Sequence, residues 1–490
     1  MTNKKIVVIG AGFAGISAAT CLADSGFDVT VLEKNNTAGG RARCFSQEGF
    51  LFDMGPSWYW MPDVFERYFN RFNSEVSDFY QLERLDPSYT VIFGEDEFVD
   101  IPASLDELYS LFESYEKGSS KKLKAFLNEA AFKYEVGIKK LVYKPSRSLT
   151  EFLSFRLLLD VLKCDVFTSF HKHIRKFFNN EKLLELMEFP VLFLGALSKN
   201  TPALYSLMNY ADIKLGTWYP MGGMHKIIEG MVALAESKGV KFHYGEPVTN
   251  IEVENNRAKV IHTTHEQYTP DFVIGGADYH HIDQKLLSEK HRTYSSDYWE
   301  KRVMAPSCLI YYLGINKKLD NLNHHNLFFD EDFGPHAEAI YKTKKFPENP
   351  LFYVSAPSKT DKTVAPSGCE NLFILIPIAS GLEENETIRE QYYDMVMDRL
   401  ERLTKQNIRD AVVVKKSYAH RDFVDDYNAF KGNAYGLANT LRQTAILKPT
   451  IKSKKVKNLY YTGQLTVPGP GVPPSLISGQ VVADEIIKNS

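Results

Sequence analysis

The chain has 490 residues, too many for one ordinary hydrophobic core, so we expect two or three domains. Its formal net charge of −3 gives no general attraction for nucleic acid, and its apolar runs are shorter than the about 18 residues of a membrane-spanning helix. Five scattered cysteines without a CxxC pair argue against a disulfide or zinc framework. With no secretory segment before the first strand, they favour a cytoplasmic protein.

The N-terminal segment predicts a dinucleotide-binding β–α–β unit. Its sequence is KKIVVIGAGFAGISAATCLADSGFDVTVLEK. IVVI indicates a short buried strand, GxGxxG precedes an apolar helix, and DVTVLE indicates a second strand that ends in Glu33. Gly10 permits the tight turn, Gly12 leaves room for a pyrophosphate, and Gly15 brings the helix against the strand. Glu33 can accept hydrogen bonds from ribose hydroxyls. The adjacent residues expected at the cofactor are Ala11, Phe13, Ala14 and Lys34.

A second glycine pair and two arginines follow, in GGRAR, and then FDMGPS, residues 52–57. An NAD dehydrogenase usually continues here with another β–α unit. This chain instead resembles the long flavoprotein signature of the amine oxidase and carotenoid desaturase superfamily. There the GG-R-x-R segment lies along the pyrophosphate and flavin, and FDMGPS approaches the flavin ring. The resemblance implies FAD, held in this part of the chain by Gly40, Arg41, Arg43, Gly55, Pro56 and Ser57. A solvated arginine pair is the plainer alternative.

Residues 104–215 have helical periodicity, and one stretch in them, residues 148–178, mixes apolar, aromatic and basic side chains. Basic and aromatic residues together on short helices suit the surface of an anionic membrane. The alternative is a core helix pair with a solvated basic edge. The residues concerned are Lys163, His171, Lys172, His173, Arg175, Lys176, Phe170, Phe177 and Phe178.

Two groups of residues are candidates for contact with a substrate. Trp58, Tyr59 and Trp60 either line a tunnel or pack in the core. Arg156 and Asp160, four residues apart on an expected helix, have either a role at the tunnel or only an ion pair with each other. Neither group identifies a catalytic acid or base, so the catalytic residues stay unknown at this stage.

Residues 300–420 alternate strand-like runs with one clear helix, whose apolar stripe follows Asn385 as a plausible N-cap. We expect these runs to form an antiparallel sheet. The histidine pairs His280–His281 and His324–His325 lack the helical spacing of metal ligands, so we expect no metal.

Near the C-terminus, GQLTVPGPGVPPSLISG follows a short strand and contains many prolines and glycines. We expect a stiff bent loop that leads into a helix starting near Pro474. In the flavoproteins that the chain resembles, this segment returns to close the flavin site, and the helix N-terminus faces the ring. The residues expected at the cofactor are Gly463, Gln464, Gly471, Val472, Pro473 and Ser475. A surface proline loop is the alternative.

With both ends placed, the chain resembles the bacterial-type phytoene desaturases, FAD-dependent carotenoid desaturases, almost end to end. The resemblance includes YPMGGM, VIGGADYHH and FKGNAYGLANTLRQTAILKP, and it places Val248 against the adenine. Two departures, Leu465 and Pro474 in place of glycines, blur the substrate assignment. The implied fold is α/β: a Rossmann-like FAD-binding domain with an interleaved antiparallel-sheet substrate domain and a helical lid. The expected boundaries are 1–90, 216–295 and 421–490 for FAD binding, 91–103 and 296–420 for substrate, and 104–215 for the lid.

The resemblance implies oxidation of a carotenoid hydrocarbon, most simply phytoene to lycopene, at a membrane surface with a quinone or oxygen as electron acceptor. A later-pathway enzyme, such as a hydroxycarotenoid 3,4-desaturase or a C30 diapophytoene desaturase, is the alternative. A different FAD oxidase, acting on an amine or a porphyrin precursor, would share both termini. A non-enzymatic binder resembling GDP-dissociation inhibitors shares the fold, but the intact glycines and Glu33 argue against it.

Overall fold

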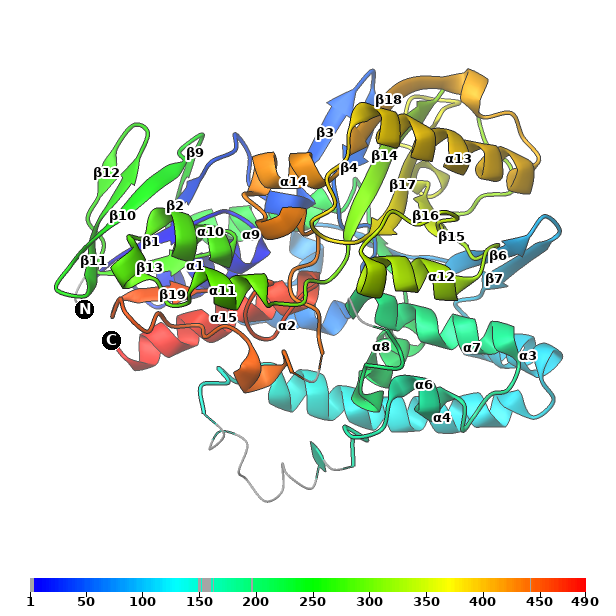
Figure 1. Ribbon diagram of the computed structural model, residues 1–490, viewed down its shortest axis with the longest axis horizontal. Coiled ribbons are helices and arrows are strands. Elements are labelled where there is room, and N and C mark those ends of the chain that lie inside the picture. The colour runs from blue at the N-terminus through cyan, green and yellow to red at the C-terminus, as the bar shows by residue number, and fades with distance from the viewer. Residues whose placement is uncertain (1–3, 149–150, 152–159, 162, 195–196, 441) are drawn as a thin grey trace.

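The computed structural model describes residues 4–148, 151, 160–161, 163–194, 197–440 and 442–490 (Figure 1). One half of the molecule is built on a five-stranded parallel sheet in the order β19-β13-β1-β2-β9. The strand bounds are Leu459–Tyr461, Phe272–Gly275, Lys5–Ile9, Asp28–Glu33 and Lys241–Tyr244 in that order. This arrangement confirms the Rossmann-like fold expected from the N-terminal motif.

Both faces of this sheet are buried, which explains why its strands are apolar at successive positions. Ile6 and Val8 belong to the core shared with α1 (Phe13–Asp24), α9 (His225–Ser237) and α15 (Val472–Lys488). Val7 and Ile9 point to the other face, toward the three-stranded sheet β10-β11-β12. The bounds of these three strands are Val248–Glu254, Arg257–Thr263 and Gln267–Tyr268.

The other half is built on a seven-stranded sheet in the order β18-β14-β17-β16-β15-β6-β7. Its bounds are Val412–Tyr418, Ser307–Ile315, Glu370–Ile378, Phe352–Ser355, His325–Phe328, Tyr89–Gly94 and Glu97–Ile101. The expected antiparallel pairing holds except between β15 and β6, which are parallel. The β6–β7 hairpin joins the sheet from a distant part of the chain. The predicted helix is α13 (Glu386–Thr404), and the Asn385 side chain caps it by accepting from the Ile388 N–H.

Successive side chains along each strand point to opposite faces of this sheet. Leu309 and Tyr311 pack with α13, whereas Ile310 and Leu375 line a cavity on the opposite face. Beneath that face in Figure 1 lies the helical region, which contains α3, α4, α6, α7 and α8. Their bounds are Leu105–Tyr115, Ser119–Tyr134, Phe170–Ile174, Glu181–Glu188 and Leu207–Asn209. The residue boundaries between the three regions stay a prediction.

Smaller elements connect these layers. Two-stranded sheets pair β3 with β4 and β5 with β8, with bounds Cys44–Gln47, Phe50–Asp53, Leu82–Arg84 and Trp218–Pro220. The remaining α-helices of the described residues are α2, α10, α11, α12 and α14, with bounds Pro62–Asn70, Tyr279–His281, Ser296–Glu300, Phe333–Glu338 and His420–Tyr427. None of the helices in the described ranges has both the length and the apolar character needed to cross a bilayer.

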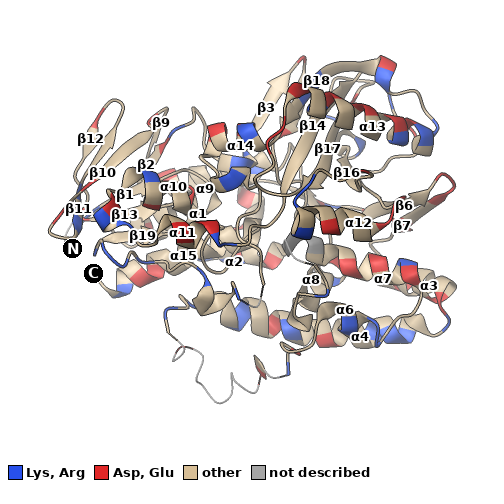
Figure 2. Ribbon diagram, in the orientation of Figure 1, with Lys and Arg blue, Asp and Glu red and all other residues tan. Residues whose placement is uncertain are grey.

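The mixed basic and aromatic stretch is only partly on the surface. Phe170 and Phe178 are buried in the core, and so is His173, whereas Lys172 and Arg175 are exposed. Figure 2 shows charges of both signs over α4, α6 and α7. The expectation that these phenylalanines meet a membrane is therefore wrong for Phe170 and Phe178, because they fill the space between α6 and its neighbours. Part of the stretch, including residues 152–159, lies outside the described residues.

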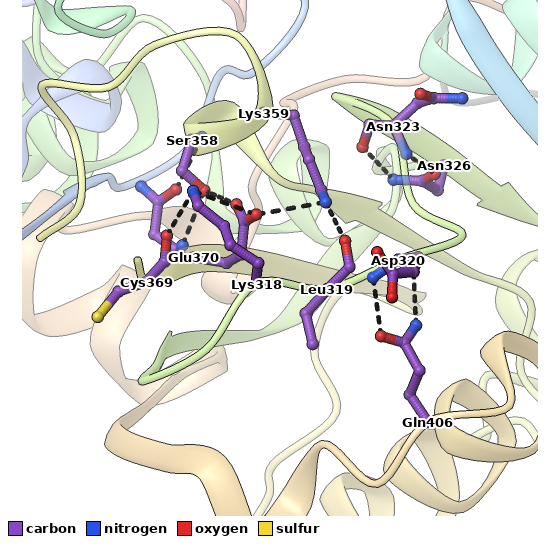
Figure 3. Close-up of polar contacts among 11 residues, drawn as sticks. Lys318, Leu319, Asp320, Asn323, Asn326, Ser358, Lys359, Cys369, Glu370 and Gln406 are labelled. Carbon is purple, nitrogen blue, oxygen red and sulfur yellow. Dashed lines mark hydrogen bonds and ion pairs between the residues drawn. The ribbon is translucent and has the colours of Figure 1, made fainter. Parts of the chain in front are cut away.

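A polar cluster holds the loops at one end of the seven-stranded sheet (Figure 3). Glu370, which is 1% exposed, accepts a hydrogen bond from the Ser358 hydroxyl and forms ion pairs with Lys359 at 3.3 Å and Lys318 at 3.4 Å. Each lysine also donates to a backbone carbonyl, Lys318 to that of Cys369 at 2.9 Å. The buried charge is thus paired and hydrogen-bonded, as burial requires.

Candidate cofactor and substrate site

A cavity of about 580 Å³ extends from the carboxyl ends of β1 and β2 to the inner face of the seven-stranded sheet. In an open α/β sheet, this edge is where ligands bind. One part of the lining is the glycine turn with its flanking loops, and the other is apolar. The two parts belong to one continuous cavity.

The three glycines of the N-terminal motif meet different surroundings. A Cβ on Gly12 would have nothing within 4 Å, so the backbone there borders open space. A Cβ on Gly15 would lie 2.0 Å from the Gly10 carbonyl oxygen, and one on Gly10 would lie 2.9 Å from the Ala277 nitrogen. Gly12 therefore leaves a cradle of the kind a pyrophosphate fills, while Gly10 and Gly15 allow close packing of the backbone.

Glu33 is the last residue of β2, and hydrogen bonds hold its carboxylate at the cavity. Its Oε2 accepts from the Ala11 N–H at 2.8 Å, and its Oε1 accepts from the Asn35 N–H and side-chain amide, both at 2.9 Å. The residue is 5% exposed and lines the cavity. Because Oε2 accepts only one of these bonds, it retains a lone pair for a ribose hydroxyl.

Only one arginine of the GGRAR segment faces the cavity. Arg41 donates to the Asn433 carbonyl at 2.9 Å and lies over the Tyr427 ring, with its centre 5.2 Å from the centroid. Burial lowers the pKa of Arg41, and the nearby Asp278 opposes that shift. Arg43 instead forms an ion pair with Asp426 at 2.6 Å. The alternative of a solvated pair does not hold, since both side chains have partners.

The FDMGPS and YPMGGM segments meet through one carboxylate. The two oxygens of Asp53 accept from the Met224 N–H at 2.6 Å and the His225 N–H at 2.9 Å, at the start of α9. Burial alone would lower the pKa of His225, but hydrogen bonds with Asp53 and Cys44 outweigh it and raise the pKa to about 10. Asp53 therefore fixes the loop that carries Gly55 and Ser57 along the cavity.

The C-terminal segment returns to the N-terminal unit, as expected. Helix α15 begins at Val472, slightly before the predicted start near Pro474, because Gly471 serves as N-cap and Pro473 and Pro474 fit the first turn. It crosses α1 so closely that a Cβ on Gly479 would lie 2.3 Å from the Ala14 carbonyl oxygen. The helix N-terminus thus borders the cavity.

The apolar part of the cavity is formed by the seven-stranded sheet, by α8 and α12, and by the helical turns η5 (Phe189–Leu194) and η10 (Ala339–Thr343). Its side chains include Phe189, Met208, Ile310, Leu327, Ile340, Leu351 and Leu375. A lining of this kind excludes water and suits a hydrocarbon.

The predicted cofactor residues all line the cavity except Ala11, Gly15 and Arg43. Ala11 acts through its N–H on Glu33, and Gly15 packs against the turn. The cavity brings the other residues together, Val248 included, and their role as cofactor contacts stays a prediction. Of the three aromatic residues, Trp58 and Trp60 line the cavity, whereas Tyr59 is buried and its hydroxyl lies 3.0 Å from that of Tyr80.

Of the two catalytic candidates, the structure describes only Asp160. Arg156 lies outside the described residues. Asp160 forms an ion pair with Lys140 at 3.0 Å and is not part of the cavity lining.

The sequence interpretation missed several residues of the lining, among them Asn35, Ala277, Asp278, Tyr427 and Tyr435. A signal existed for Ala277 and Asp278, because they follow a buried strand, and parallel strands present their carboxyl ends at one edge. Tyr427 arrives on α14 from a distant part of the chain and has no local signal.

A possible metal cluster lies apart from this cavity. Glu129, Asp165 and His173 offer ligand atoms within 4.8 Å of one another. The Lys133 ammonium lies among them, 2.9 Å from Asp165 and 3.1 Å from His173 Nε2. Since the lysine ammonium already pairs with Asp165 and lies against the histidine nitrogen, we assign no metal to this cluster.

Known proteins resemble this chain over its whole length. The family described as flavin containing amine oxidoreductase matches residues 13–487. A carotenoid 3,4-desaturase of Haloarcula japonica is 40% identical over 499 residues, covering 100% of this chain and 99% of the relative. A zeta-carotene-forming phytoene desaturase of Myxococcus xanthus is 31% identical over 493 residues, covering 99% and 94%. An oxidoreductase structure from Methanosarcina mazei has a TM-score of 0.64 at 18% identity over 98% of this chain and 100% of that one, a likeness of fold alone.

Proposed function

Since the chain belongs to the flavin containing amine oxidoreductase family and, within it, to the FAD-dependent carotenoid desaturases, we propose that it introduces double bonds into a long acyclic carotenoid. The first candidate reaction is phytoene to lycopene. The observation that carries the proposal is the single cavity, in which a glycine cradle and a ribose-accepting glutamate are continuous with an apolar chamber. A hydrocarbon chain in that chamber ends beside the cofactor.

The residues present fit FAD. The open space at Gly12 suits the pyrophosphate, the free lone pair of Glu33 suits a ribose, and the Arg41 guanidinium supplies a cation along the cavity. When bound, FAD supplies the acceptor of a hydride from the carbon chain. The N-terminus of α15 adds a positive dipole end at the cavity, and the apolar side chains exclude water.

A later-pathway desaturase is the second candidate, and a specific feature favours it. Tyr341 and Tyr435 both line the cavity, and burial raises the pKa of each. Within the described ranges, neither hydroxyl has a hydrogen-bond partner. A hydroxyl without a partner is unfavourable in an apolar chamber from which water is excluded, and an oxygen on the substrate would satisfy it. The Haloarcula japonica relative at 40% identity is named as a 3,4-desaturase, which agrees with this candidate.

We also propose that the protein works at a membrane surface and passes its electrons to a quinone or oxygen. A carotenoid dissolves in the bilayer, so the substrate must enter from there. Phe167 is 88% exposed and lies close in sequence to the exposed basic residues Lys163 and Lys172. An exposed aromatic with flanking cations suits an anionic interface.

Co-expression tests the proposal. The chain is expressed in one host that makes only phytoene and in a second host that makes a coloured, hydroxylated acyclic carotenoid, and the pigments are extracted. Visible polyenes in the first host support phytoene as the substrate. Colourless cells despite FAD-loaded protein contradict the first candidate, and a red shift confined to the second host supports the second.

A further inference from the structure

Desaturation removes two hydrogens, and the proposed function leaves one of them without an acceptor. One hydrogen leaves as a hydride, and the neighbouring carbon must then lose a proton. The cavity's apolar part, as far as the structure describes it, holds few groups able to take it. His336 is an unsuitable acceptor, because both ring nitrogens are bonded to backbone groups, the Pro377 carbonyl and the Leu351 N–H.

Tyr353 is the exception. It lies on β16 in the cavity lining, and its hydroxyl oxygen is 2.6 Å from Nδ1 of His325 on the adjacent strand β15. The His325 ring is fully buried and stacks on Trp58, with centroids 4.1 Å apart and planes at 11°. Its Nε2 has no hydrogen-bond partner in the described part of the chain, so no second bond fixes its tautomer.

A serine connects this pair to the cavity. The hydroxyls of Ser355 and Ser57 lie close enough to Tyr353 to lower its pKa, although burial raises that pKa overall. Ser57 lines both the main cavity and a small neighbouring one that also contains Ser355 and His324. The phenol therefore has polar neighbours on one side and the apolar chamber on the other.

The low basicity of His325 is sufficient for removal of the substrate proton. Burial lowers the pKa of His325 well below its ordinary value, and the adjacent His324 adds to this. Such a histidine is neutral at ordinary pH and is a weak base. A weak base suffices, because a carbon chain that has lost a hydride is cationic and its neighbouring C–H bond is strongly acidic.

We propose that Tyr353 is the catalytic residue that receives the substrate proton and that His325 acts through it. The C–H bond on the carbon next to the hydride donor breaks, and its electron pair forms the new double bond. The proton passes to the Tyr353 oxygen as the Tyr353 hydroxyl proton passes to His325 Nδ1. The hydride leaves with the electron pair of its own C–H bond, and FAD, when bound, would supply its acceptor. After release of the product, His325 returns its proton through Tyr353 and Ser57 to water that enters the emptied cavity.

The test compares Tyr353→Phe with the control Tyr311→Phe, which removes a buried tyrosine hydroxyl on the opposite face of the same sheet, where it donates to the Arg389 carbonyl. FAD-loaded protein is mixed anaerobically with acyclic carotenoid in liposomes, and flavin reduction is followed in a single turnover. We expect Tyr353→Phe to slow the reaction by about 100-fold or more with unchanged FAD affinity, and Tyr311→Phe to slow it far less. Equal rates in wild type and Tyr353→Phe would overturn the proposal.

A second readout separates a chemical role from a structural one. With substrate deuterated at the carbon that loses the proton, the isotope effect on flavin reduction should be larger in Tyr353→Phe and His325→Phe than in wild type. An unchanged isotope effect in both variants would contradict the relay. If Tyr353→Phe does not fold, His325→Phe, which keeps a ring to stack on Trp58, decides alone. A wild-type protein that no carotenoid reduces would refute the proposed function itself, a result distinct from failure of the relay.

Discussion

Two glycines of one turn allow the cofactor site to be tested at the scale of a single residue. A Cβ on Gly12 meets nothing within 4 Å, so Gly12→Val should fold and yet fill the space expected for the pyrophosphate. We expect this variant to lose FAD binding, measured by flavin absorbance after reconstitution. Glu33→Ala should weaken binding by only about 1–3 kcal/mol, because it removes one hydrogen-bonding group.

The control is Gly15→Val, whose Cβ would lie 2.0 Å from the Gly10 carbonyl oxygen. That variant should lower the melting temperature, whereas Gly12→Val should not. Retention of normal FAD affinity by Gly12→Val would refute the assignment of the cradle.

A second prediction for a single residue concerns the buried Lys448 and the pH dependence of stability. It is 3% exposed, its Nζ has no hydrogen-bond partner among the described residues, and burial lowers its pKa from 10.5 to about 7. Between these two pH values the unfolded chain binds the proton and the folded chain does not, so stability rises with pH. We expect Lys448→Met to raise the melting temperature at pH 7. The difference from wild type should shrink as the pH approaches 10.5, and a difference independent of pH would contradict the assignment.

At the scale of elements, the polar cluster of Figure 3 should hold the loops to the end of β17. Glu370→Ala leaves a buried serine hydroxyl and two lysines without their shared carboxylate. We expect a loss of about 1–3 kcal/mol in chemical denaturation, below the cost of a fully buried pair because Lys318 is largely exposed. The control is Asp96→Ala, which breaks an exposed pair with Lys405 and should cost much less. Equal losses in the two variants would show that burial of Glu370 has no effect.

Helix α6 and the chain before it test the proposed membrane contact. We expect the triple charge reversal of Lys172, Arg175 and Lys176 to reduce sedimentation with anionic liposomes, and Phe167→Ser to reduce it further at high salt. Lys172 and Lys176 should contribute more than Arg175, since Glu188 lies 2.5 Å from the arginine. Lys405→Glu serves as the control, because Lys405 is the C-cap of α13, a helix at the top of the view in Figure 1, whereas α6 is near the bottom. Equal binding by all variants would refute membrane contact through this surface.

Elements with strong local signals were predictable. The strand before Gly10, the N-cap at Asn385 and the proline-rich entry to α15 each combine a residue preference with a hydrophobic pattern. The environment of the phenylalanines around α6 was not predictable, because the same sequence pattern occurs in segments that face a membrane and in segments that face a core. The packing of α4 against α6 determines which of them are buried.

At the scale of the whole molecule, the cavity depends on contacts between distant parts of the chain. Glu33 was predictable from its distance to the glycine motif, but Tyr427 reaches the site only through α14. Tyr353 and His325 are separated by 28 residues and meet because β15 and β16 pair. Spacing within one strand or helix cannot reveal such a pair, since sheet order and register create it.

We infer that one cavity holds both FAD and the carbon chain that it oxidises. The most direct measurement is the absorbance of oxidised flavin in the reconstituted protein when acyclic carotenoid in liposomes is added without oxygen. We predict bleaching of the flavin band with formation of a longer polyene in equal amount. If the flavin stays oxidised with phytoene and with hydroxylated acyclic carotenoids, while dithionite still bleaches it, the claim is contradicted.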